Sequence, residues 1–408
     1  EYLYRHSMKK KYVRWTLWTI ASPFILFVIL CILIYLPPIQ NFLVDKAAVY
    51  ASEATGMNIS VGRISLSFPL NLVVTDVDAA SPHNDTLLSV RRLQVNVQLL
   101  PLLKKQVEVD GISLQGATVN SNDLIHGMKL NGTLGELFIS SHGVALDPET
   151  AIVNKVLLKD TDLSLCLNDT AAVDTAASDT TYWKIILQDI DLQNVSFALD
   201  MPLDSLSLAA SLDNAILRDG LIDLHKSAYS LQTFRIKNGR VRYDSGKPLA
   251  ADSLPSGLDP SHIALTDIGV KLDSLYYEGR NMKAIISQFV LKERSGVEIV
   301  SATGRMVSND KVLRVPSLKL ETRDSYLELN AAMDWNALDF KGEGLVSARL
   351  MADIGKPDVV RFMGRMDEKF VRQYPSEPLR IRTGIDGDLN KLKLTTLTAE
   401  LPGALGLL

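Results

Sequence analysis

The sequence has few of the residues that build catalytic and metal centres. Its 408 residues include two cysteines, Cys31 and Cys166, and six histidines. No two histidines stand at a spacing that brings two imidazoles to one metal, and neither cysteine has a neighbouring histidine. A Gly-x-Ser-x-Gly elbow and a phosphate-cradling glycine loop are also missing. We therefore predict no catalytic residue, no cofactor and no metal, and we expect that the protein is not an enzyme.

An excess of positive charge is missing as well. The chain has 43 basic and 47 acidic side chains, for a formal net charge of -4. This balance supplies no basic stripe that would release counterions from a phosphate backbone, so nucleic acid is not expected as a partner. Hydrophobic residues make up 47% of the chain, which is enough for a core or for a long apolar surface.

One long uncharged segment lies near the N-terminus. Residues 17–36 read LWTIASPFILFVILCILIYL, and as a helix they would span about 30 Å, the hydrocarbon thickness of a bilayer. Lys9, Lys10, Lys11 and Arg14 precede the segment, which predicts a cytoplasmic tail over residues 1–14, a single transmembrane helix over residues 15–36, and the rest of the chain outside the cytoplasm. The alternative, a cleaved signal peptide, usually has a shorter apolar region.

Residues 37–56 predict a short amphipathic helix beside the membrane. Phe42, Leu43 and Tyr50 are among the apolar residues at helical spacing, and Gly56 suits the end of a helix. The pattern allows two interpretations: a cap packed on the first strands, or a helix lying in the outer face of the bilayer.

The remainder, residues 57–408, is expected to form one β-rich domain. Apolar and polar residues alternate over short stretches, and Asn131-Gly132, Asp219-Gly220 and Asn238-Gly239 suit tight hairpin turns. An antiparallel sheet follows from this pattern. Two segments, 107–119 and 185–197, carry apolar residues at the same six positions and shift their alternation at the same two places, as a bulge or turn would.

One helix is expected within this domain, near its C-terminal end. Residues 358–373 follow Pro357, which suits a helix start, and they place Phe362, Met363 and Phe370 among the apolar residues of one helical face. We expect this helix to pack across the sheet or to plug part of it.

The strand-forming segments resemble a known family. They read GMNISVGRISLSFPLNLVVTDV at residues 56–77 and LLSVRRLQVNVQLLPLLKKQVEVDGISLQGATV at residues 87–119, with FRIKNGRVRYD at residues 234–244. These phrases resemble the AsmA-like superfamily, in particular its TamB branch. The resemblance is strongest over residues 15–120. Because residues 401–408 end in what looks like a strand, we expect the chain to be the N-terminal portion of a longer protein.

The resemblance implies a mainly β fold in which a long antiparallel sheet is folded into an elongated open groove, a β-taco. It implies a single-pass protein of the cell inner membrane, with its bulk in the periplasm, that moves phospholipids towards the outer membrane. The alternative that it implies is an accessory factor for the translocation and assembly of outer-membrane proteins, acting with a BamA-like partner. A third hypothesis is a structural tether whose sheet only sets the spacing between membranes.

Alternation adds a physical mechanism to this resemblance. Alternate side chains of a strand point to one face, and an apolar face would dissolve acyl chains at about 0.8 kcal/mol per buried methylene. A closed dry core would produce the same alternation. The sequence also does not say which of the two alternating sets of side chains faces inward. The candidate groove-lining residues are Ile112, Leu114, Val119, Ile190, Leu192, Phe197, Phe234 and Ile236.

Overall fold

A computed structural model describes most of the chain after the predicted membrane segment. The described residues are 46, 48–49, 52–53, 55–67, 71–81, 85–98, 109–121, 127–145, 149–168, 182–246, 257–339, 344–364, 366–400 and 402. The transmembrane helix predicted over residues 15–36 lies outside them. Within the described residues, no helix has the length and apolar character needed to cross a bilayer.

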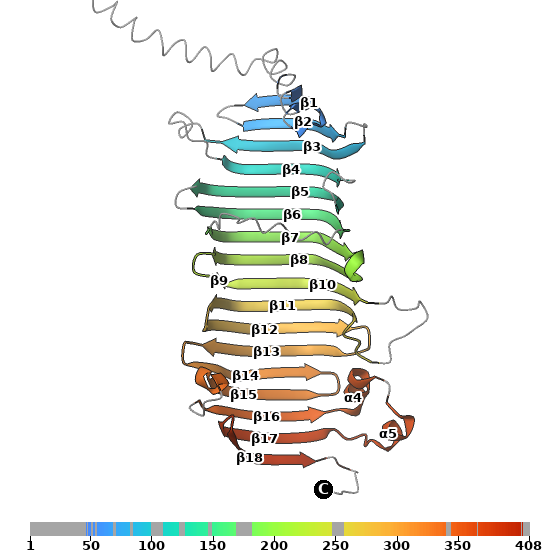
Figure 1. The fold of residues 1–408 in the computed structure, drawn as a ribbon, viewed down its shortest axis with the longest axis vertical. Helices are drawn as coiled ribbons and strands as arrows, with labels where there is room; N and C mark the ends of the chain where they lie inside the picture. Colours follow the sequence, from blue (N-terminus) through green and yellow to red (C-terminus); the bar gives the residue numbers. More distant parts are fainter. Residues whose placement is uncertain are drawn as a thin grey trace, which may run out of the picture. The chain divides into compact units, whose positions relative to one another are not determined.

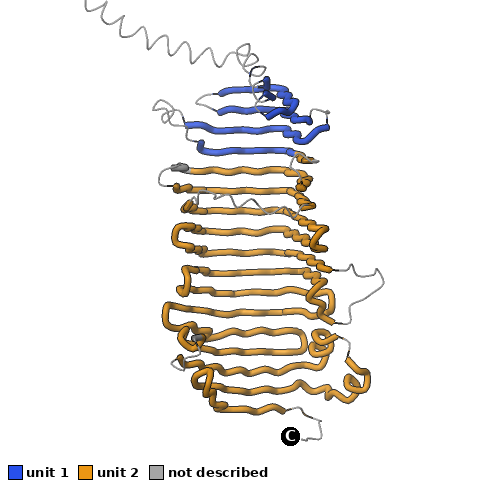
Figure 2. Tube along the Cα trace, viewed as in Figure 1, with its two compact units in different colours: residues 1–117 blue, residues 118–408 orange. Residues whose placement is uncertain are grey.

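The chain divides into two compact units, residues 1–117 and 118–408 (Figure 2). In the first unit, the described residues from Lys46 to Thr55 are helical, and the N–H of Gly56 donates to the carbonyl of Ser52 at 2.9 Å. Gly56 has a φ of 70°, as expected of a glycine that ends a helix. The strands that follow are β1 (Asn58–Ser67), β2 (Asn71–Ala80) and β3 (Thr86–Val97), paired antiparallel in that order. A fourth strand, β4 (Val109–Asn120), runs across the division.

The second unit is mainly β. Its strands are β5 (Met128–Ala145), β6 (Thr150–Leu167), β7 (Lys184–Met201), β8 (Leu206–Asp223), β9 (Ala228–Leu231), β10 (Thr233–Ser245), β11 (His262–Glu278), β12 (Asn281–Glu293), β13 (Glu298–Ser308), β14 (Val312–Thr322), β15 (Tyr326–Asp334), β16 (Val346–Ile354), β17 (Leu379–Asp388) and β18 (Lys391–Glu400). Its helices are two 3-10 turns, η1 (Pro202–Asp204) and η2 (Trp335–Asp339), and two short α-helices, α4 (Lys356–Met363) and α5 (Glu368–Gln373).

These strands form one long sheet in which neighbours in sequence are neighbours in space (Figure 1). β9 and β10 share one row, because both pair with β8 on one side and with β11 on the other. The prediction of a mainly β fold with a long antiparallel sheet is confirmed. Among the described strands β5 to β18, one neighbouring pair, β6 and β7, is parallel. Sixteen residues separate these two strands, from Asn168 to Trp183, and a parallel pair needs a connection of that length.

The three expected hairpin turns were predicted wrongly. Asn131-Gly132, Asp219-Gly220 and Asn238-Gly239 lie inside β5, β8 and β10. Asp219 and Asn238 do have positive φ, 51° and 53°, but they adopt it as β-bulges within a strand. A bulge and a tight turn both use the left-handed region, so the residue types alone do not distinguish them.

The internal similarity has a structural basis. Gly116 and Asn194 hold the same position in the two similar segments, and both have positive φ, 63° and 51°. At each of them the alternation of side chains shifts by one residue, so that apolar residues on both sides of the bulge stay on one face.

The predicted helix over residues 358–373 is two helices. Gly364, with a φ of 75°, ends α4, and α5 begins after Asp367, whose side chain accepts from the N–H of Lys369. The expected core packing is wrong as well: Phe362 is 58% exposed, Met363 65% and Phe370 49%.

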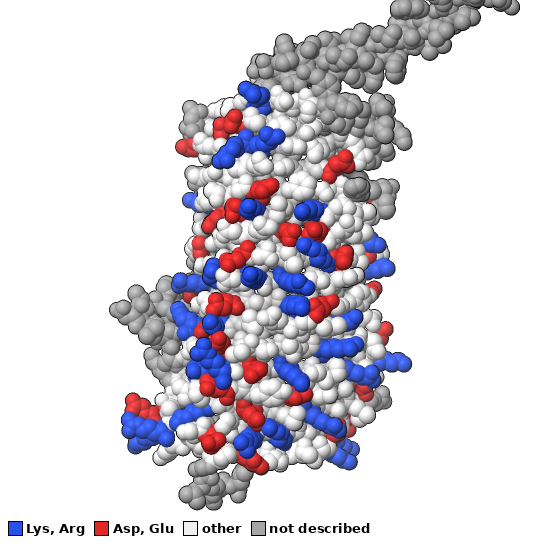
Figure 3. Space-filling model, turned by 180° about the vertical axis from the view of Figure 1, so that it is seen from behind, with Lys and Arg blue, Asp and Glu red and all other residues white. Residues whose placement is uncertain are grey.

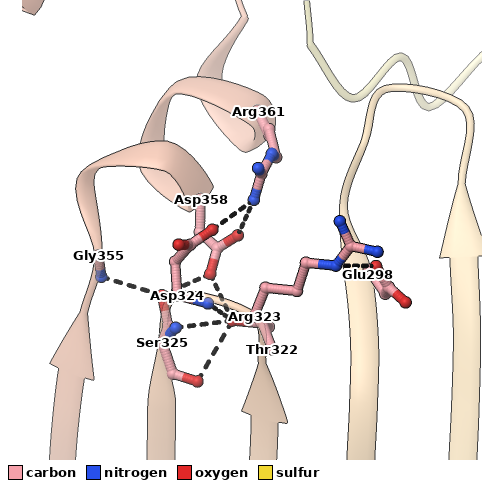
Figure 4. A network of polar contacts seen from close by, with 8 residues as sticks. All are labelled: Glu298, Thr322, Arg323, Asp324, Ser325, Gly355, Asp358 and Arg361. Atoms are coloured by element: carbon pink, nitrogen blue, oxygen red, sulfur yellow. Dashed lines mark hydrogen bonds and ion pairs between the residues drawn. The ribbon is translucent and has the colours of Figure 1, made fainter.

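Polar contacts attach α4 to the end of the β14–β15 hairpin (Figure 4). The Asp358 carboxylate accepts hydrogen bonds from Thr322 and Ser325, the latter at 2.7 Å, and the Arg361 guanidinium bridges it to Asp324. Burial raises the pKa of Asp358, but the hydrogen bonds from Thr322, Ser325 and Arg361 outweigh burial and hold that pKa below its ordinary value. The helix is therefore held by ionic contacts and not by its apolar face.

Candidate functional site: the apolar face of the sheet

The strand register of the second unit aligns apolar side chains into ladders that run across the sheet. Directly paired residues share a face, so each ladder can be followed from strand to strand. The first ladder, from β5 to β18, is Ile139, Val156, Ile190, Leu217, Phe234, Leu272, Ile286, Gly304, Leu318, Leu329, Leu350, Thr383 and Leu397.

A second ladder lies beside the first, two residues along each strand except where a bulge intervenes. Its members are Leu137, Leu158, Leu192, Ala215, Ile236, Val270, Phe289, Ala302, Leu320, Leu327, Ala352, Ile381 and Ala399. Neither ladder contains a charged residue. Together they make an uninterrupted apolar strip through every row of the unit.

The predicted candidate residues fall on this face where the register can be followed. Ile190 and Phe234 belong to the first ladder, and Leu192 and Ile236 to the second. Phe197 belongs to a shorter ladder on the same face, which runs from Leu163 through Ala210 and Val241 to Leu265 and then reaches the charged Glu293. The structure therefore brings all five candidates of the second unit to one face.

The remaining three candidates lie in β4. Ile112, Leu114 and Val119 occupy one face of that strand, because the bulge at Gly116 shifts the alternation between Leu114 and Val119. Ile112 is 36% exposed.

The apolar strip is not a closed core. Among the described residues, no large side chain is fully buried, and the buried apolar residues are mostly small. In the second ladder Ala215, Ala302 and Ala352 are buried between larger neighbours. Phe197 of the shorter ladder is 38% exposed, and Leu397 of the first ladder, on the wholly exposed strand β18, is 63% exposed. The described residues thus form a sheet whose apolar side chains stay partly open to solvent.

The strip extends over a large area of the sheet. Neighbouring rows are about 4.8 Å apart and same-face residues about 6.6 Å, so each ladder position has a footprint of about 32 Å² and both ladders together have one of about 800 Å².

The opposite face is polar from β10 onward, whereas in β5 to β8 its residues between the two ladders are Phe138, Leu157, Asp191 and Ile216. From β10 onward, the residue between the two ladder positions of a strand points to this opposite face. These residues include Arg235, Lys271, Lys319, Glu328 and Arg382. Figure 3 shows a face on which basic and acidic side chains are interspersed. From β10 onward the two faces of the sheet therefore differ in chemistry.

Ion pairs stabilise charges on this polar face. Arg382 contacts Asp353 at 2.7 Å and lowers the pKa of that carboxyl, and Asp267 contacts Lys292 at 2.8 Å and raises the pKa of that ammonium. Arg218 lies between Asp189 and Asp191. Both aspartates lie inside β7, and their partner is on β8.

A row of residues with positive φ crosses the polar face of the second unit. Asp160, Asn194, Asn238 and Asp267, on β6, β7, β10 and β11, all have φ between 49° and 53°. Asn194 donates to Asp160 at 2.9 Å, and Asn238 donates to Asp213, which lies between them on β8. Aspartate and asparagine tolerate the left-handed region better than other residues with a Cβ, and each bulge bends its strand.

Neither a metal-binding group among the described residues nor a similar known protein helps to identify the function of this site. Within the described residues, no three His, Cys, Asp or Glu side chains gather as a group that could hold a metal ion. No known family model matches the sequence. No curated protein matches it either. The register of the sheet is thus the main observation on function.

Proposed function

We propose that the chain is a passive bridge, anchored in the inner membrane, that conducts phospholipids through the periplasm towards the outer membrane. The observation that carries this proposal is the pair of charge-free ladders that runs without interruption from β5 to β18. A polar patch in either ladder would have favoured a simple tether, and the two ladders contain none.

The energetics suit acyl chains. Each methylene transferred from water to the apolar strip contributes about 0.8 kcal/mol, so a chain of a dozen methylenes gains about 10 kcal/mol before the cost of its ordering. Phosphate head groups would remain in water at the open side. Since the hydrophobic effect is non-directional, an acyl chain can move from row to row without losing its contacts.

The dimensions suit conduction across the strands. The fourteen strands of the second unit make thirteen rows, because β9 and β10 share one, and twelve spacings of about 4.8 Å give a path of about 58 Å. The ladders follow this path. The row of positive φ from Asp160 to Asp267, with register shifts beside Asn238 and Asp267, supports a bend in the sheet, which would fold the apolar face into a groove.

Photo-crosslinking at adjacent residues tests the proposal. A photoreactive amino acid is placed at Leu192, on the apolar face, or at Gln193, on the opposite face. Gln193 pairs with Asn214 of β8. Whole cells are irradiated and adducts are identified by mass spectrometry. Phospholipid at Leu192 and not at Gln193 is the expected result. Lipid at neither residue, with a protein adduct instead, would favour the assembly of outer-membrane proteins.

A further inference from the structure

Three basic side chains gather on the polar face of the second unit, at a concavity that Ile236 and Val270 of the second ladder also line. Arg235 and Lys237 of β10 and Lys271 of β11 line a concavity of about 620 Å³. Arg235 and Lys237 are exposed and Lys271 is half-buried. The amide side chains of Asn214 and Gln288 line the same concavity.

The three cations are close together. Arg235 and Lys271 are direct partners in the antiparallel register, which places their Cβ atoms about 5 Å apart. Lys237 follows Arg235 by two residues on the same face, about 6.6 Å along the strand. Like charges directly opposite each other repel, so a bound anion would relieve this arrangement.

Nearby acidic groups have other cationic partners. Asp267, which also lines the concavity, contacts Lys292 at 2.8 Å, and Asp213 contacts Arg240 at 3.9 Å. Asp191, further along the sheet, is held by Arg218. Within the described part of the chain, Arg235, Lys237 and Lys271 make no hydrogen bond or ion pair through their side chains, so their charges remain available.

We propose that this cluster binds a phosphate group. The guanidinium of Arg235 offers two parallel N–H donors, and the ammonium groups of Lys237 and Lys271 offer further donors from the other sides. A phosphate has three acceptor oxygens and close to two negative charges, which match three converging cations better than a carboxylate does. The amide of Gln288 supplies a neutral donor. This site lies on the face opposite the apolar ladders and does not depend on lipid conduction.

Calorimetric titration of the full chain with inorganic phosphate at low ionic strength tests the site. The expected result is saturable binding with one phosphate per chain. Arg235→Gln and Lys271→Gln should each weaken it about tenfold, as loss of a charge-assisted hydrogen bond does. The matched control is Lys283→Gln, because Lys283 is exposed on the same face but outside the concavity. It should change affinity less than about twofold.

Vesicles distinguish the two sources of phosphate. The chain is mixed with vesicles of phosphatidylcholine that contain some phosphatidic acid, and the vesicles are sedimented. If the wild-type chain sediments with these vesicles and the Arg235→Gln variant does not, the site binds a lipid head group. Phosphate binding without sedimentation would assign it to a soluble phosphate compound. Absence of saturable phosphate binding, or equal weakening by Lys283→Gln and Arg235→Gln, would overturn the proposal and leave lipid conduction on the other face unaffected.

Discussion

Replacing Leu192 tests whether the apolar face binds acyl chains. Leu192 lies in the second ladder between Leu158 and Ala215. Its position covers about 32 Å², and at about 25 cal/mol per Å² a covering acyl chain gains about 0.8 kcal/mol there. Leu192→Ser should therefore weaken lipid binding about fourfold. Leu192→Asp should weaken it more than about a hundredfold, because the carboxylate would have to lose its hydration beneath the lipid at several kcal/mol.

Equilibrium binding of a fluorescent phospholipid to the purified full chain measures this effect, and Gln193→Asp is the matched control. Gln193 is adjacent in sequence but belongs to the polar face, so its replacement should change affinity less than about twofold. Circular dichroism and thermal unfolding establish that each variant keeps its sheet. Equal loss of binding in Leu192→Asp and Gln193→Asp, with both variants folded, would refute the reasoning.

Three further predictions concern stability. Asn238→Val should lower the free energy of unfolding by about 1–2 kcal/mol relative to Asn238→Gly, because a β-branched residue is strained at a φ of 53°; equal stability of the two variants in urea would argue against the bulge. Asp358→Asn should lose about 1–3 kcal/mol near neutral pH. The pKa of Asp358 in the folded chain lies below 3.8, so the difference in stability between wild type and Asp358→Asn should persist above pH 3.8 and vanish as the pH falls through the folded pKa. A difference in urea unfolding that does not depend on pH would contradict this prediction. Phe362→Ser should change stability by less than about 0.5 kcal/mol because Phe362 is 58% exposed, and a loss of 2 kcal/mol in the same assay would restore the core-packing interpretation.

Much of the apolar face could be predicted from the sequence. Strand alternation has a period of two, so Ile190 and Leu192, or Phe234 and Ile236, must share a face once the segment is a strand. The bulge at Asn194 was visible as a shift in that alternation, and this shift explains why Phe197 joins the same face. The sequence did not show which strands pair, so the alignment of Leu192 with Ile236 through Ala215 required the structure.

The wrong predictions arose where one residue pattern serves two structures. Asn238-Gly239 suits a tight turn, but here the positive φ of Asn238 belongs to a bulge inside β10. Helical spacing continued through Gly364, which nevertheless ends α4 because a glycine readily adopts positive φ. The parallel pair of β6 and β7 left no local signal, since each strand alternates in the same way whichever direction its neighbour runs.

The polar face was missed for a related reason. Arg235 and Lys271 are 36 residues apart in sequence, and only the pairing of β10 with β11 places them side by side. The partnership of Arg218 with Asp189 and Asp191 is likewise a cross-strand contact. Charges scattered along a strand indicate a solvated face, but their grouping depends on register.

The most direct test of the central claim is a photo-crosslinking scan along the length of the sheet. Three positions of the second ladder, on β7, β14 and β17, are each compared with the adjacent residue on the opposite face. The pairs are Leu192 with Gln193, Leu320 with Lys319, and Ile381 with Arg382. A continuous lipid path predicts phospholipid adducts at all three ladder positions and at none of their neighbours. Adducts at a single row, or equally on both faces, would contradict it.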